Sequence, residues 1–144
     1  MQTRNSPHIH KSALFEFITT HGDGSFNSWQ MTQHDLHNAT FEAPVGPPKE
    51  NEEPNVPPLF ISADFLYETK SEAACIIFGT TSGDLMIFDE NRKQWIGEVE
   101  MLSRSEPSAI TVISNYGEYL FVGNEKGYLK RYHISFSDDA DWIE

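Results

Sequence analysis

Hydrophobic positions and glycines recur along this chain at one fixed spacing. Two glycines, a leucine and an aromatic residue return 44 residues further on: Gly79, Gly83, Leu85 and Phe88 reappear as Gly123, Gly127, Leu129 and Tyr132. A fixed period of roughly 40–45 residues is typical of the blades of a four-stranded β-propeller. The repeat therefore predicts an all-β architecture and limits the functions that are plausible.

Each recurrence has the pattern of a β-hairpin. A β-branched and aromatic run leads to a glycine turn, and an aromatic residue follows that glycine by five positions. A third example near the start has Gly24 and Trp29 in these places. The glycines supply the turn residues with positive φ. Apolar residues two positions after each glycine, Phe26, Leu85 and Leu129, alternate with more polar neighbours, so we expect one face of each return strand to be buried.

Further β-prone runs fill the space between the hairpins. Residues 59–66 and 109–114 fit the innermost strands of the second and third blades, and Gly117 fits the short turn that follows the latter. Residues 94–100 fit an outer strand of the second blade, with a weaker one at 37–42 and another beginning at 140–144. No long helical period appears.

The three hairpins resemble WD40-type repeats, whose inner hairpin runs approximately small-x-Asp-Gly-x-apolar-x-x-Trp-Asp. The match is degenerate in each: the first keeps Asp23, Gly24 and Trp29, the second has Ser82 and keeps Phe88 with Asp89, and the third has Lys126 and Tyr132. The Gly-His dipeptide that usually opens a blade is absent, so the family's hydrogen-bonded His/Asp/Ser-Thr/Trp network is expected to be incomplete. Another propeller class with a G-x-L-x-x-aromatic blade stays open.

The repeat divides the chain into a partial first blade (1–42), a connecting loop (43–58), a second blade (59–102) and a third (103–144). These blades form an arc, because closed propellers typically have 4–8 blades. The count predicts a partial chain, such as a truncated isoform or one segment of a larger propeller. A self-sufficient small domain and completion by another copy or a partner are the alternatives.

The connecting loop interrupts the repeat, because 59 residues rather than 44 separate Gly24 from Gly83. It holds six of the chain's eight prolines and four charged residues. Pro44, Pro47 and Lys49 fit the PxxPx[K/R] pattern that SH3 grooves bind as a polyproline II helix. An inert rigid connector is the alternative.

Composition and charge narrow the class of partner. The formal net charge is −12, from 22 acidic and 10 basic residues, and disfavours nucleic acid and anionic membranes as partners. No apolar run is long enough to cross a membrane, and the first residues lack a signal-peptide core. The lone Cys75 lies in a predicted buried strand, which favours a reducing, cytoplasmic compartment. Degenerate WD40 repeats are also common in large cytoskeletal and ciliary proteins, so such a location is the alternative.

No residue pattern predicts catalysis, a cofactor or a metal. The available acids occur at turns and strand ends, where solvated charge is expected: Asp64, Glu68, Asp84, Asp89 and Glu90. The pairs His8/His10 and His34/His37 lack further ligands at a recognisable spacing. We therefore expect a non-catalytic scaffold that binds proteins or peptides. The alternatives are a fragment of a quinoprotein- or glycosidase-type propeller enzyme and a structural module of a large cytoskeletal or ciliary WD40 protein.

Overall fold

The computed structural model describes residues 2–4, 15–44, 57–68, 73–100 and 108–134. Their regular structure is entirely β-strand, arranged in three sheets. Within the described ranges, no helix has the length and apolar character needed to cross a membrane. The chain divides into two compact units, residues 1–60 and 61–144.

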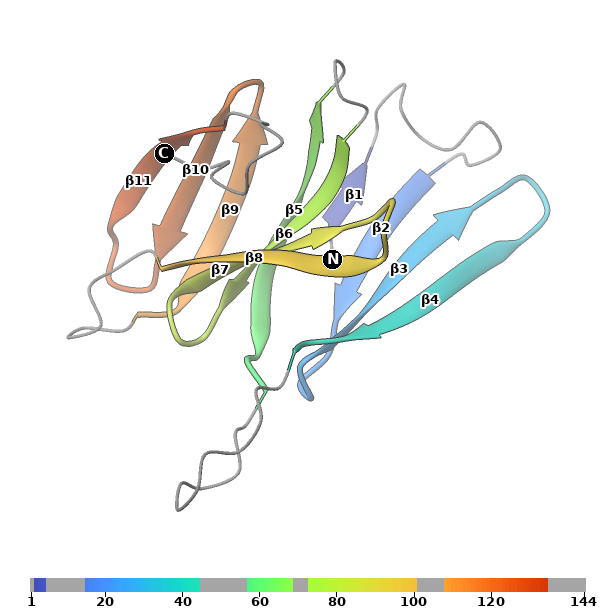
Figure 1. Ribbon diagram of the computed structural model, residues 1–144, viewed down its shortest axis with the longest axis horizontal. Coiled ribbons are helices and arrows are strands. Elements are labelled where there is room, and N and C mark those ends of the chain that lie inside the picture. Colours follow the sequence, from blue (N-terminus) through green and yellow to red (C-terminus); the bar gives the residue numbers. More distant parts are fainter. Residues whose placement is uncertain (1, 5–14, 45–56, 69–72, 101–107, 135–144) are drawn as a thin grey trace. The chain divides into compact units, whose positions relative to one another are not determined.

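The first sheet has the order β1-β2-β3-β4 (Figure 1). Its strands are β1 (Gln2–Arg4), β2 (Phe15–Thr20), β3 (Ser25–Met31) and β4 (Leu36–Glu42), and sequential neighbours pair antiparallel. The first strand of this sheet, β1, comprises three residues.

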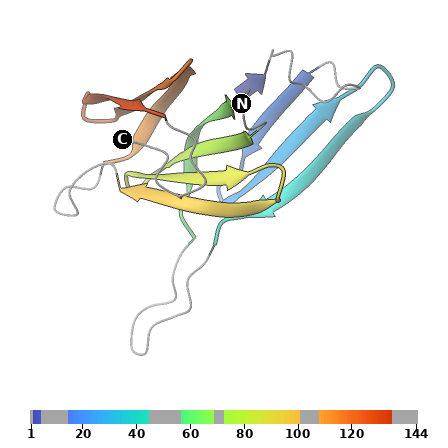
Figure 2. The ribbon, with the colours of Figure 1, turned by 45° about the horizontal axis from the view of Figure 1, so that its top comes forward.

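The second sheet has the order β5-β6-β7-β8. Its strands are β5 (Phe60–Glu68), β6 (Ala73–Thr80), β7 (Asp84–Asp89) and β8 (Gln94–Glu100). Figures 1 and 2 show that β5 and β8 run at a steep angle to each other, which is the accumulated right-handed twist of a four-stranded sheet. The strand predicted at 94–100 is present with these bounds.

The third sheet has the order β11-β10-β9. Its strands are β9 (Ile110–Tyr116), β10 (Tyr119–Asn124) and β11 (Leu129–His133). Strand β9 reaches two residues beyond the predicted 109–114, because Tyr116 still pairs with Tyr119 across a tight turn in which Gly117 has φ 61°. The outer strand expected at 140–144 lies outside the described residues.

The three hairpins share one pairing register. The residue two positions after the turn glycine pairs with the end of the preceding strand in each sheet: Thr20 with Phe26, Gly79 with Leu85, Gly123 with Leu129. The repeat aromatic also pairs with an apolar residue in each: Phe17 with Trp29, Ile76 with Phe88, Leu120 with Tyr132. The sequence repeat therefore corresponds to a structural repeat.

A hydrophobic cluster joins the second and third sheets within the second unit. The second sheet contributes Leu66, Cys75, Ile77, Leu85 and Ile87, and the third contributes Ile110, Ile113, Leu120, Val122 and Ile134. Cys75 is 1% exposed, which confirms the prediction that it is a buried core residue.

Candidate functional site

The repeat glycines form the same turn in all three hairpins. Gly24, Gly83 and Gly127 have φ values of 83°, 96° and 84°, the positive values expected from the sequence. Each glycine N–H donates to the carbonyl three residues earlier, at 3.4 Å, 3.4 Å and 3.0 Å respectively. Glycine is favoured at these positions because a side chain there would be strained.

The turns differ in the side chain that stabilises them. In the first turn, Asp23 accepts hydrogen bonds from the Ser25 hydroxyl at 2.6 Å and its backbone N–H at 2.9 Å, and these bonds hold the pKa of Asp23 below its ordinary value. In the second, Thr80 Oγ1 accepts from the Asp84 N–H at 3.0 Å. In the third, Asn124 Oδ1 accepts from the N–H groups of Lys126 and Tyr128. Different polar residues therefore hold equivalent turns.

Two of the turn glycines lie against the segment that enters the next strand, and the third does not. A Cβ atom on Gly24 would stand 2.8 Å from Pro57 Cβ and 3.1 Å from the Pro58 carbonyl. On Gly83 it would stand 2.9 Å from the Ser108 carbonyl. Around Gly127 no described atom comes within 4 Å of that position.

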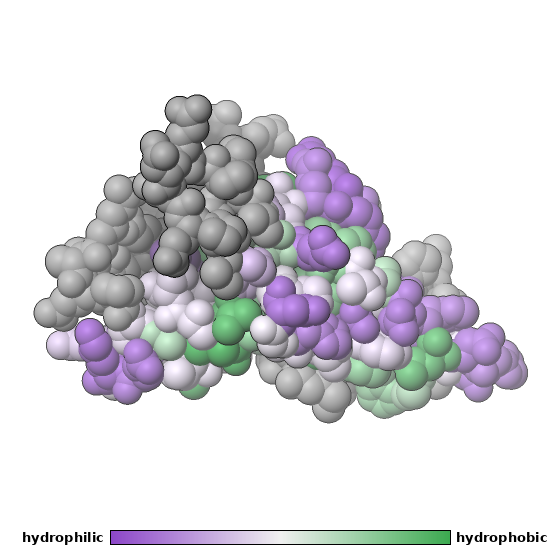
Figure 3. Space-filling model, turned by 90° about the horizontal axis from the view of Figure 1, so that it is seen from below, coloured by the Kyte–Doolittle hydropathy of each residue, from purple (hydrophilic) through white to green (hydrophobic). Residues whose placement is uncertain are grey.

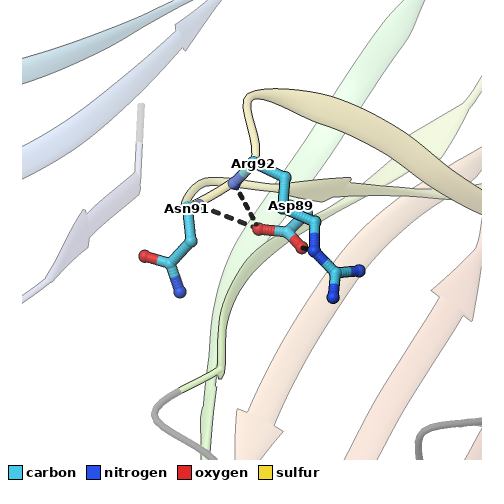
Figure 4. A network of polar contacts seen from close by, with 3 residues as sticks. All are labelled: Asp89, Asn91 and Arg92. Carbon is cyan, nitrogen blue, oxygen red and sulfur yellow. Dashed lines mark hydrogen bonds and ion pairs between the residues drawn. The ribbon is translucent and has the colours of Figure 1, made fainter.

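Asp89 is a buried cap of the β7–β8 turn (Figure 4). Its Oδ1 accepts the backbone N–H groups of Asn91 at 2.8 Å and Arg92 at 2.9 Å, and Arg92 Nε lies 3.7 Å from its other oxygen. Asp89 is 8% exposed, so the expectation of a solvated charge is wrong for this residue. The reason is that two turn amides replace water as donors to the carboxylate.

Asp64 links the second sheet to the third. Its Oδ2 accepts the Asn115 backbone N–H at 2.6 Å, and its Oδ1 accepts the N–H of Phe65 at 2.8 Å. Nearby, the Ser62 hydroxyl donates to the Ile110 carbonyl at 2.6 Å. The two bonds between the sheets were not foreseen from the sequence, because their partners are about fifty residues apart and only the packing of the sheets brings them together.

A side-chain hydrogen bond holds the repeat tryptophan of the first sheet. The Trp29 indole Nε1–H donates to Thr19 Oγ1 at 2.9 Å, and the ring stacks on Phe17 with centroids 5.7 Å apart. Phe88 and Tyr132, the corresponding residues, have no indole N–H and cannot donate in this way. The tryptophan–threonine hydrogen bond therefore occurs in one of the three hairpins.

The third sheet exposes a face that is buried in the second. We call the side of β10 and β11 opposite the hydrophobic cluster the far face, formed by Tyr119, Phe121, Gly123, Leu129 and Arg131. Leu129 is 71% exposed, so the expected burial of the residue after the turn glycine is wrong here, although it holds for Phe26 and Leu85. The space-filling view in Figure 3 shows hydrophobic residues exposed in patches between hydrophilic ones.

The polar residues singled out in the sequence do not converge on a metal site. His34 and His37 are exposed, and the described residues hold no group of three or more His, Cys, Asp or Glu placed to bind a metal ion. In the proline-rich loop Pro44 is exposed, while Pro47 and Lys49 lie outside the described residues. The SH3-ligand hypothesis therefore stays a prediction. His8 and His10 also lie outside the described residues.

Lys130 and Arg131 do not form a joint basic patch. Lys130 lies 5.9 Å from the centroid of Tyr132, whereas the Arg131 guanidinium lies 4.9 Å from that of Tyr119. Strand alternation sends the two side chains to opposite faces, as expected from the sequence.

Comparison with known structures identifies the fold. The β-propeller domain of Cps50 (Swd1) from Myceliophteria thermophila superposes with a TM-score of 0.63 at 14% sequence identity. The match covers 90% of this chain and 41% of that domain. Comparisons with family models and with curated proteins found no match. The chain therefore has an all-β fold of antiparallel sheets that correspond to blades of a β-propeller.

Proposed function

From this propeller fold we propose that the chain is a non-catalytic protein-interaction scaffold built from degenerate WD40-like blades. The observation that carries the proposal is the use of two acids, Asp64 and Asp89, which both accept backbone N–H groups. A carboxylate committed to backbone amides stabilises the fold, whereas general acid–base catalysis needs one that faces a substrate. The tryptophan–threonine pair of the first sheet supports the WD40-like assignment.

The partners would be other proteins or peptides, bound by loops and sheet faces on a rigid frame. The acidic balance of the chain argues against nucleic acid and anionic membranes. Further blades, from the same protein or another chain, would complete the propeller.

The scaffold proposal is tested by crosslinking the tagged protein in cells and identifying its neighbours by mass spectrometry. We expect crosslinks to one reproducible protein, retained in an Asp84→Asn, Glu90→Gln double variant that neutralises two acids at the ends of β7. Turnover of a glycoside, or of an alcohol with a quinone acceptor, would overturn the proposal if the double variant abolished it.

A further inference from the structure

Two hairpins of this chain are covered in the same manner by an extended segment. On the second sheet, Ser108 lies against Gly83, and Ile110 lies directly on Gly79, where an added Cβ would stand 2.5 Å from its Cγ2 atom. On the first sheet, Pro57 and Pro58 both lie against Gly24, and the contact of Pro58 is through its carbonyl. Both covering segments thus begin with a small residue or proline at the turn glycine.

The first sheet also receives a large apolar side chain from its covering segment. The ring of Phe60 meets that of Phe26 edge-on, with centroids 6.4 Å apart. Phe60 follows Pro58 by two positions, as Ile110 follows Ser108. The chain therefore contains two examples of one binding mode, in which a turn contact precedes an apolar anchor by two residues.

The far face of the third sheet has the same layout, and the described residues place no such cover on it. Gly123 and Leu129 stand 44 residues after Gly79 and Leu85 and are paired in the same register. Leu85 is 0% exposed and Leu129 is 71% exposed. The nearest described atom to an added Cβ on Gly123 is Val112 Cβ at 3.7 Å, within its own sheet.

The far face also differs from its counterpart in charge. Arg131 occupies the position of Ile87, and its guanidinium lies over the Tyr119 ring at 4.9 Å. No described carboxylate pairs with Arg131, although the chain carries 22 acidic residues. A desolvated guanidinium gains most from a carboxylate, which it binds with paired, charge-assisted hydrogen bonds.

Resting on the scaffold function above, we propose that the far face binds an extended segment of a partner protein. The segment carries serine or proline opposite Gly127, a large apolar residue two positions later over Gly123 and Leu129, and a carboxylate further along that reaches Arg131. The apolar anchor provides affinity, and the carboxylate provides orientation and selectivity.

The chain itself supplies matched probes for this surface. A peptide of residues 58–66 contains Pro58, Phe60 and Asp64, whereas a peptide of residues 108–116 contains Ser108 and Ile110 and has no acidic residue. Each is labelled with fluorescein and titrated with the full chain, and binding is followed by fluorescence anisotropy. We expect both to bind and the 58–66 peptide to bind more tightly, with the difference lost when its Asp64 is replaced by Ser.

Two adjacent exposed residues give a matched pair of variants. Leu129 belongs to the far face, and the adjacent Tyr128, 64% exposed, lies in the turn that precedes β11. Leu129→Glu should weaken both peptides by at least about tenfold, and Tyr128→Glu by less than about twofold. Arg131→Gln should weaken the 58–66 peptide by about fivefold and leave the other unchanged. Equal thermal melting of these variants shows that each is folded.

Absence of saturable peptide binding, or equal losses in the two Glu variants, would overturn the proposal. So would a wild-type dimer, detected by light scattering, that Leu129→Glu dissociates, because the face would then belong to a second copy. If Leu129→Glu abolishes peptide binding but leaves the crosslinked neighbour in place, the scaffold binds that neighbour elsewhere. If no neighbour is found but the peptides bind as expected, the scaffold function fails and the binding face stands.

Discussion

The second and third sheets are built from the same repeat and nevertheless bury different amounts of it. Leu85 and Leu129 occupy equivalent positions in hairpins of the same register, yet one is fully buried and the other 71% exposed. Strand β9 covers this face of the second sheet, while the described residues place no strand over the far face of the third. A repeat therefore encodes a hairpin, and the neighbouring element decides which of its apolar residues enter the core.

The turns of these two sheets show the same contrast. Gly83 and Gly127 share a positive φ, but only Gly83 has a backbone carbonyl within 3 Å of its missing Cβ. Glycine is needed at Gly83 for two reasons, conformation and space, and at Gly127 for conformation alone. Substitutions at equivalent positions can measure this difference.

Leu85→Ala and Leu129→Ala give the largest expected contrast. Loss of the buried Leu85 side chain leaves a cavity and should reduce the free energy of unfolding by about 3 kcal/mol. Loss of the exposed Leu129 side chain should reduce the free energy of unfolding by less than about 0.5 kcal/mol. Urea denaturation of both variants measures the difference, and equal losses would show that Leu129 is also buried in solution.

Alanine at Gly79 and Gly123 should act in opposite directions. At Gly79 a Cβ would stand 2.7 Å from Ile110 Cβ, so overpacking should destabilise by about 2 kcal/mol. At Gly123 the nearest atom is at 3.7 Å, and the lower entropy of the unfolded chain should stabilise by about 0.5 kcal/mol. A strongly destabilised Gly123→Ala variant would contradict the open far face.

Gly83→Ala and Gly127→Ala should differ by about 1 kcal/mol. Both place a Cβ in the left-handed region, which costs about 1 kcal/mol. Only the Gly83 variant also meets the Ser108 carbonyl, at 2.9 Å, which adds about 1 kcal/mol. Thermal melting compares the two, and a neutral Gly127→Ala variant would contradict the positive φ.

Titration of Tyr132 should give the smallest effect. Burial raises the pKa of Tyr132, the residue equivalent to Phe88. Because its folded-state pKa is the higher one, its contribution is fully present below the unfolded tyrosine pKa of about 10 and is lost as the pH rises through the folded value. Tyr132→Phe should therefore flatten the fall in stability above about pH 10, measured by denaturation at successive pH values.

Much of the local structure was predictable because it depends on neighbouring residues. The turns were predicted from three glycines, Gly24, Gly83 and Gly127, and the strands from the β-prone runs beside them. The buried state of Asp89 and the bond from Asn115 to Asp64 were not predictable, because they depend on a turn geometry and on sheet packing that sequence spacing does not encode. The carboxylate at Asp64 was visible in the sequence, but its partner was not.

The sequence by itself determined that the chain forms repeated β-hairpins with one register, because glycine conformation and strand alternation act over a few residues. Only the tertiary structure decided that Leu85 is core and Leu129 is surface. The physical reason is that burial belongs to the pair of surfaces in contact, so an apolar residue contributes to the core only when another element lies over it.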